Sequence, residues 1–270
     1  VHDFIFGGME NVAATTLTDL VLTDERAALD WDAESLIAHE LAHQWFGDLV
    51  TCQDWSQGYL NEAWATYSEI LWKVEDLGQE EADYHLYGDL KNYLSECASR
   101  YKRPIVSYQF REPIDMFDRH LYEKGALVVH TLRTILGEQA FWPAVTRYLQ
   151  DNAHTTVHTR DFQVALEQTS GRNLDGFFQD WILSPGHPAL TIKTAWTKDL
   201  LKVTVTQRQK GDGVPEAYQF PLSLLIVTEN GEQTVTLPVG ERSRTWAIPM
   251  EKEPMRVEVD SGFKILANLT

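Results

Sequence analysis

The chain has 270 residues, of which 43% are hydrophobic and 11% aromatic, a composition that can form a packed core and excludes a disordered chain. The length suggests one large or two modest domains. The formal net charge of −17 argues against nucleic acid as a partner, because phosphate binding needs a basic face. No run approaches the ~18–20 apolar residues of a membrane span. Two cysteines, Cys52 and Cys97, make no disulfide framework, so a reducing compartment, the cytoplasm, is mildly preferred.

The first two thirds of the chain are predicted to be mainly helical. Residues 1–6 have the pattern of a strand already in progress, so we expect the sequence to be a piece of a longer protein. Beyond them, apolar residues recur with the spacing of amphipathic helices. We expect helices at residues 33–47, 58–77, 80–100, 119–136, 138–151, 159–170 and 174–183.

The periodicity changes after residues 184–188, Ser-Pro-Gly-His-Pro, which break helices. Alternation with period two then predicts strands at residues 190–194, 201–206, 222–227, 234–239, 244–248 and 256–259. Asn230-Gly231 predicts a tight hairpin between two of them. Short strands in such number favour a small β-sandwich. We therefore expect an α+β protein with a helical domain at 1–186 and an all-β sandwich domain at 187–270 that serves as a spacer or packing module.

The most informative motif is His39-Glu40-Leu41-Ala42-His43. A helix turns about 100° and rises about 1.5 Å per residue, so His39 and His43 lie about 40° apart in azimuth and about 6 Å apart along the axis. Two imidazoles with this spacing can bind one zinc ion at roughly 2.0–2.1 Å. Glu40 projects beside the ion, where a base acting on a metal-bound water must be.

A third ligand is predicted at Glu62, nineteen residues after His43, on a second helical stretch rich in apolar residues. The simpler interpretation of the motif is an amphipathic helix with two surface histidines. Apolar neighbours argue against it, because they make the segment a largely buried helix, and buried histidines and carboxylates are costly without partners. We expect one zinc ion per chain, bound by His39, His43 and Glu62.

Four features coincide in order and spacing: Gly7-Gly8-Met9-Glu10-Asn11, the histidine helix, Glu62, and Tyr122-Glu123-Lys124-Gly125-Ala126. Together they resemble the zinc aminopeptidases of the aminopeptidase N type, gluzincins that include leukotriene-A hydrolase. The resemblance runs from about residue 3 through residue 188. It implies a thermolysin-like catalytic domain. In that family this domain follows an amino-terminal β-domain and precedes a β-sandwich, and a helical array often closes the chain. We expect those amino-terminal and carboxy-terminal domains in the parent protein.

The resemblance also implies roles for individual residues. Tyr122 would be the phenol that supports the oxyanion, and Glu10 the carboxylate that holds the substrate's free α-ammonium. The substrate backbone would pair with a strand formed by Gly7, Gly8, Met9, Glu10 and Asn11. Gly8 stands where many members have alanine. Without the zinc helix nearby, Glu10 would be an ordinary loop acid. Without its place before Lys124-Gly125-Ala126, Tyr122 would be a core or interface tyrosine.

The function predicted from these residues is hydrolysis of the amino-terminal peptide bond of peptides with a free amino terminus. Three alternatives remain open: an endopeptidase of the thermolysin type, an epoxide hydrolase side activity, and a non-catalytic scaffold. An endopeptidase leaves the Gly-Gly-Met-Glu-Asn segment unexplained, and a scaffold tends to lose the base or a ligand. Because the absent amino-terminal domain usually supplies a second acid to the ammonium site, we expect weak or no activity from this chain alone.

Other candidates carry less weight. His154 and His158 have the same four-residue spacing, but the β-branched residues between them disfavour a helix, and we predict a surface loop. Asp48 either orients a ligand histidine or lies in a surface turn. Glu69 lies seven residues after Glu62 and shares its predicted helix face, and it receives no assigned role.

Overall fold

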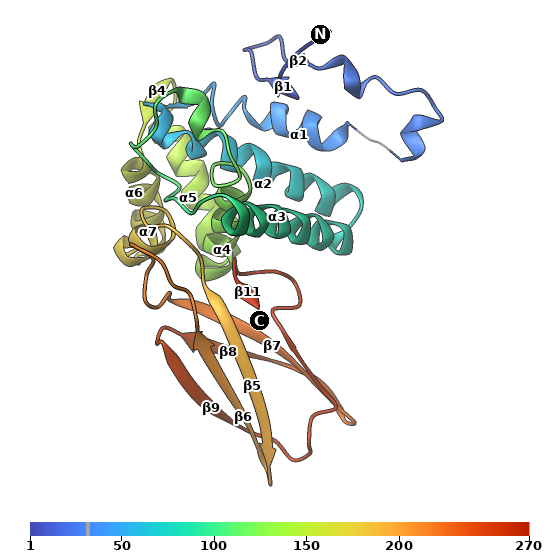
Figure 1. Cartoon of the computed structure of the whole chain (residues 1–270), viewed down its shortest axis with the longest axis vertical. Helices are drawn as coiled ribbons and strands as arrows, with labels where there is room; N and C mark the ends of the chain where they lie inside the picture. Colours follow the sequence, from blue (N-terminus) through green and yellow to red (C-terminus); the bar gives the residue numbers. More distant parts are fainter. Residues whose placement is uncertain (31–32, 270) are drawn as a thin grey trace.

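The computed structural model describes residues 1–30 and 33–269. The helices and the short strands near them form one part of the molecule and strands β5 to β11 the other, with the amino terminus at the helical end (Figure 1). The helices are α1 (Glu34–Ala42), α2 (Tyr59–Asp76), α3 (Gln79–Ser99), α4 (Glu123–Leu136), α5 (Glu138–Asp151), α6 (Thr159–Ser170) and α7 (Asp175–Trp181). Short 3-10 helices lie at Asp19–Val21, Ala27–Leu29, Trp55–Gln57 and Pro113–Met116. The protein is thus of mixed helix and strand content, as predicted.

Helix α2 is central to the helical part, because it contacts α1, α3 and α4. Its apolar residues recur every three or four positions, so one face is buried along most of its length. Trp64 on that face is 1% exposed and stacks on Phe46 with ring centroids 4.5 Å apart. This packing fixes α1 and the turn after it against α2, and so positions His39 and His43 against Glu62.

One face of α1 is more exposed than the sequence predicts. Ile37, Leu41 and Trp45 are 50%, 57% and 48% exposed, and with Trp72 of α2 they line an apolar groove of about 500 Å³. The predicted buried helix is therefore wrong for this face, because within residues 1–30 and 33–269 no other element covers it. The opposite face, with Glu40 and Ala42, is buried.

The short strands differ most from prediction. Residues 1–6 form no strand; strand β1 is Gly8–Met9 and pairs antiparallel with β2 (Thr16–Leu17). A strand needs a partner strand, and β2 pairs only with Gly8 and Met9, not with residues 1–6. The predicted loop at 154–158 contains β4 (Thr155–Val157), which pairs in parallel with β3 (Val50–Cys52). Helix α1 ends at Ala42 rather than at 47, although His43 keeps helical dihedral angles.

The strand-rich part contains two sheets. Four strands lie in the order β11 (Asn268–Leu269), β5 (Ala189–Thr197), β6 (Leu200–Gln207) and β9 (Ser243–Pro249). The other sheet has the order β10 (Arg256–Val259), β7 (Phe220–Thr228) and β8 (Gly231–Val239). Alternate residues of β7, from Phe220 to Ile226, are buried, which confirms the period-two pattern. The predicted hairpin is present: Thr228 pairs with Gly231 across a two-residue turn.

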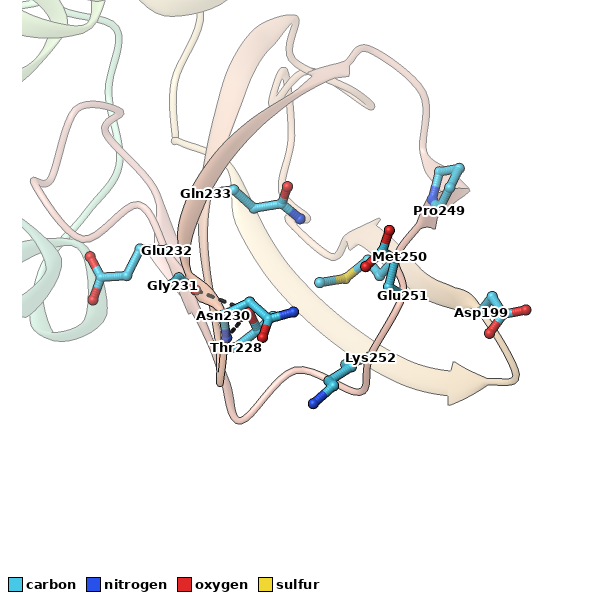
Figure 2. A pocket seen from close by; sticks show the side chains of 10 residues that line it. All are labelled: Asp199, Thr228, Asn230, Gly231, Glu232, Gln233, Pro249, Met250, Glu251 and Lys252. Atoms are coloured by element: carbon cyan, nitrogen blue, oxygen red, sulfur yellow. Dashed lines mark hydrogen bonds between the residues drawn. The ribbon is translucent and has the colours of Figure 1, made fainter.

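Side chains of both parts meet at the junction between α7 and β5. Tyr93 of α3 donates to the Gly186 carbonyl at 3.2 Å, and its hydroxyl lies 3.1 Å from His187 Nδ1. The Leu266 amide donates to Thr131 Oγ1 of α4 at 2.9 Å. At the far end of the sheets, turns between strands line an open hollow of about 740 Å³ (Figure 2). Among the described residues, every cluster of possible metal ligands lies in the helical part rather than there.

Candidate active site

A pocket of about 1300 Å³ lies where α1, α2, β1 and the start of α4 meet. It is lined by all ten residues predicted to act in catalysis, metal binding or substrate binding: Gly7, Gly8, Met9, Glu10, Asn11, His39, Glu40, His43, Glu62 and Tyr122. These residues come from four segments spread over more than 110 positions of the sequence. The fold therefore brings together the residues that the motifs had selected separately.

The two histidines converge on one carboxylate oxygen. His39 Nε2 and His43 Nε2 each lie 3.3 Å from Glu62 Oε2, with the imidazole centroids 4.8 Å apart. The other ring nitrogen of His43 lies 2.8 Å from the Phe46 carbonyl oxygen. Because a carbonyl only accepts, Nδ1 donates there and the Nε2 lone pair of a neutral ring faces Glu62. Helix α1 and the turn after it thus aim both histidines at the same point.

This donor set fits a divalent cation. Lone pairs of two imidazoles and a carboxylate oxygen that face one another repel unless a proton or a cation lies between them. Burial disfavours a charged His39, but its contacts with Glu62 and Glu69 outweigh burial and raise its pKa to about 10. Burial would raise the pKa of Glu62, yet the two histidines lower it to about 2. The cluster therefore holds positive charge tightly, and two nitrogens with one carboxylate are a ligand set that suits zinc.

Glu40 lies beside this cluster and is 4% exposed. Its Oε2 is buried without a hydrogen-bond partner. Burial is the main cause that raises the pKa of Glu40 to about 6, with His39 and His43 opposing it. Gly8 packs against this side chain, and a Cβ at position 8 would overlap the Glu40 carboxylate. A close approach of this kind explains glycine at a position where the resembling family often has alanine.

Strand β1 runs along one side of the pocket, with Glu10 directly after it. Glu10 Oε1 lies 3.9 Å from His43 Nδ1, and the Glu10 side chain is 18% exposed. The Gln44 amide donates to Asp48 Oδ2 at 2.8 Å and to the Glu10 carbonyl oxygen at 3.4 Å. Asp48 therefore contacts Gln44, while the Phe46 carbonyl orients His43. Met9 is 41% exposed beside the pocket.

Tyr122 lies at the amino-terminal end of α4, with its ring centroid 6.1 Å from that of His39. Burial first, and the negative charges of Glu62, Glu10 and Glu40 after it, raise the pKa of the phenol well above its usual value. The hydroxyl thus stays protonated and able to donate. Gly125 allows α4 to approach α2, because a Cβ there would lie 2.5 Å from Ala63 Cβ.

Sequence reasoning left Glu69 without a role, but the structure connects it to the cluster. Its Oε1 lies 2.8 Å from His39 Nδ1. Its spacing from Glu62 was the feature of the sequence that could have indicated this contact, because residues seven apart are two helical turns apart and share one face of the helix. His154 and His158 are exposed on either side of β4 and lie outside the pocket.

A second group of possible ligands, Glu96, Asp118 and His120, is buried elsewhere in the helical part. Asp118 accepts from Arg103 Nη2 at 2.6 Å and from the Tyr101 hydroxyl at 2.9 Å. Glu96 Oε2 lies 3.1 Å from His120 Nδ1. Internal partners, the Arg103 guanidinium among them, thus already satisfy this group.

Comparison with known families decides the affiliation: a model of the Peptidase family M1 domain matches residues 1–181. The chain belongs to peptidase family M1. It is 28% identical over its whole length to a protein of Sulfurisphaera tokodaii named "Probable aminopeptidase 1", of which it covers 34%. It is 31% identical to the "Alanine/arginine aminopeptidase" of Saccharomyces cerevisiae, over 93% of the chain and 30% of that protein.

The M1 fold is also found in a solved structure. The crystal structure of Legionella pneumophila aminopeptidase A in complex with aspartic acid matches with a TM-score of 0.77 at 17% sequence identity. The match covers all of this M1 chain and 31% of that chain. The chain thus spans about a third of the length of these relatives. None of the helices in the described residues is long and apolar enough to cross a membrane.

Proposed function

We propose that this chain carries the catalytic centre of a zinc-dependent aminopeptidase, which hydrolyses the first peptide bond of peptides with a free amino terminus. The observation that carries the proposal is the convergence of His39 and His43 on Glu62, with the unpaired Oε2 of Glu40 beside them in the same pocket. His39, His43 and Glu62 would hold the zinc ion, one per chain. Bound zinc would lower the pKa of a water molecule and polarise the scissile carbonyl.

Glu40 acts as the general base. It is buried, its Oε2 has no partner, and its pKa of about 6 leaves it ionised but close to neutral pH. A base performs best when its pKa is near the working pH, because it must both take and return a proton. Glu40 accepts the proton of the attacking water and passes it to the departing amine.

Tyr122 and Glu10 act on the two ends of the scissile peptide unit. The protonated Tyr122 hydroxyl donates to the oxyanion that forms at the carbonyl, a contribution that typically amounts to about 10²–10³ in turnover. Glu10 binds the α-ammonium, and the free edge of β1 pairs with the substrate backbone. With Glu10 one residue beyond that strand, cleavage falls after the first residue of the peptide.

An endopeptidase of the thermolysin type is the competing function, and the pocket chemistry around Glu10 disfavours it. A carboxylate at the end of the substrate strand forms an ion pair with a charged amino terminus. A blocked amino terminus is neutral, so it offers no such pair and displaces water from the carboxylate without compensation. Matched peptides with free and with acetylated amino termini separate the two functions. We expect cleavage of the free peptide only, and a strong loss of that preference in Glu10→Gln. Equal cleavage of both peptides would contradict the proposal.

We also propose the division into a thermolysin-like catalytic domain at 1–186 and a β-sandwich domain at 187–270. Support comes from the change of element type between α7 and β5 and from the two sheets that follow, antiparallel except for the parallel pairing of β11 with β5. Since the chain spans about a third of its relatives, we expect the 270-residue chain to bind zinc and to hydrolyse aminoacyl reporters weakly. Turnover equal to that of a longer protein containing the chain would contradict this.

A further inference from the structure

His39 is enclosed by two carboxylates of the same helix. Glu62 and Glu69 lie two turns apart on α2, so their side chains share one face. Glu62 Oε2 lies 3.3 Å from His39 Nε2, and Glu69 Oε1 lies 2.8 Å from His39 Nδ1. Each nitrogen of this one imidazole therefore faces an acid from α2.

The second contact determines which nitrogen of His39 carries a hydrogen. An ionised carboxylate only accepts hydrogen bonds, so Nδ1 of His39 must donate to Glu69. In the neutral ring that binds a metal, Nε2 is then the atom that points into the pocket with its lone pair. The Glu69 side chain is 17% exposed and that of His39 is 12% exposed, so water competes little for this contact.

The two histidines are held by different acceptors. His43 Nδ1 contacts the neutral carbonyl of Phe46 at 2.8 Å, whereas His39 Nδ1 contacts a carboxylate. A charged acceptor makes a hydrogen bond roughly twice as strong as a neutral one. It also increases the basicity of the opposite ring nitrogen.

Glu69 is itself held by the third helix. Its Oε2 lies 3.6 Å from His85 Nε2 of α3, which in turn lies 3.9 Å from Asp89 Oδ1. Because one oxygen faces His39 and the other faces His85, the carboxylate has little freedom to rotate away. The contact thus connects α1, α2 and α3 through three side chains.

We propose that Glu69 is a positioning residue, which fixes the ring of His39 so that Nε2 meets the metal and strengthens that bond. The proposal rests on the proposed function, in which His39 is a zinc ligand. It assigns to Glu69 a role that acts only through His39 and requires no contact with substrate.

Zinc affinity tests the strength of this effect. In the 270-residue chain, competition with a chromophoric chelator compares the parent with Glu69→Ala, Glu69→Gln and the control Glu75→Ala, an exposed acid of the same helix. We expect Glu69→Ala to lose about 10–100-fold in affinity. Glu69→Gln, which keeps an acceptor oxygen without the charge, should lose less, and Glu75→Ala should match the parent. An affinity of Glu69→Ala within twofold of the parent, or an equal loss in Glu75→Ala, would overturn the proposal.

Solvent exchange of the imidazole N–H protons distinguishes a local role of Glu69 from a general loss of stability. A general loss would affect His39 and His43 alike. In ¹⁵N-histidine-labelled chain, the Nδ1–H protons of His39 and His43 should both exchange slowly with solvent, with and without zinc. Glu69→Ala should abolish the protection at His39 and leave His43 unchanged, because the Phe46 carbonyl is intact. Unaltered protection at His39 would refute the role of Glu69. A parent chain that binds no zinc refutes the proposed function instead, while the metal-free spectra still decide whether Glu69 holds His39.

Discussion

The helical part and the strand-rich part of this molecule bury different kinds of side chain. Residues 187–269 enclose an apolar core, from Leu190 to Ala267, and within that described range Asp260 is the one buried acid. The helical part buries many more ionisable groups, among them Glu40, His43, Lys124 and Glu123. Burial of charge costs free energy unless partners offset it. The costly buried groups, those of the candidate site among them, thus lie in the helical part, whereas the strand-rich part mainly packs apolar side chains.

Removal of one histidine should have the largest effect in the helical part. We expect His43→Ala to lower the zinc content from about one ion per chain to near zero, because two ligands bind the metal far less tightly than three. Turnover should disappear with the metal. Elemental analysis of the purified chain measures this, and an unchanged zinc content would contradict the assignment of His43.

Glu40→Gln should separate chemistry from metal binding. The substitution keeps the size of the side chain and removes its ability to accept the proton of water. We expect kcat to fall by about 10²–10⁴ with zinc content unchanged. The comparison is made in the 270-residue chain and in a longer protein that contains it. Near-parent turnover in either protein would refute the base assignment.

A substitution that creates a cavity in the strand-rich part should lower the free energy of unfolding and leave the metal site intact. Leu224 of β7 is fully buried, so Leu224→Ala should cost about 2–5 kcal/mol of unfolding free energy. Zinc per folded chain should stay at the parent value. Denaturant unfolding and elemental analysis measure the two quantities, with the exposed Leu269→Ala as control. Loss of zinc from the folded variant would show that the two parts are not separable in this way.

Lys124 tests the cost of buried charge in the helical part. It is fully buried, its Nζ lies 3.4 Å from the Ser184 carbonyl oxygen, and burial lowers its pKa to about 7. The unfolded chain binds a proton there between that pH and about 10.4, so this group makes stability rise as pH rises through that window. Below pH 7 both states are charged and the penalty is complete.

We therefore expect the parent to gain of the order of 3 kcal/mol between pH 7 and pH 9.5 relative to Lys124→Met. Denaturant unfolding of both proteins at the two pH values measures the difference. An identical pH dependence in the two proteins would show that the buried ammonium does not titrate as described.

The long elements were predictable from sequence because local patterns determine them. Helices α5 and α6 begin and end at the residues that apolar spacing predicts, 138–151 and 159–170. Strands β5 to β10 follow from period-two alternation. The short strands were not predictable, because β3 and β4 exist only through their pairing across more than 100 residues. A three-residue segment has no periodicity of its own.

The candidate site shows the same division. The spacing of His39, Glu40 and His43 within one helix predicted a shared direction, and the geometry agrees. Glu69 has an equally regular spacing from Glu62, but the sequence does not tell which neighbour a helix face meets. That information resides in the packing of α1 and α3 on α2. Likewise, the exposure of Ile37 and Leu41 depends on what packs over α1 and not on their hydrophobicity.

The most direct test of the central claim is an anomalous difference map, collected at the zinc absorption edge from crystals of the zinc-loaded chain. The account predicts a single strong peak about 2 Å from His39 Nε2, His43 Nε2 and a Glu62 oxygen. A peak at Glu96, Asp118 and His120 instead, or no peak among His39, His43 and Glu62, would contradict it.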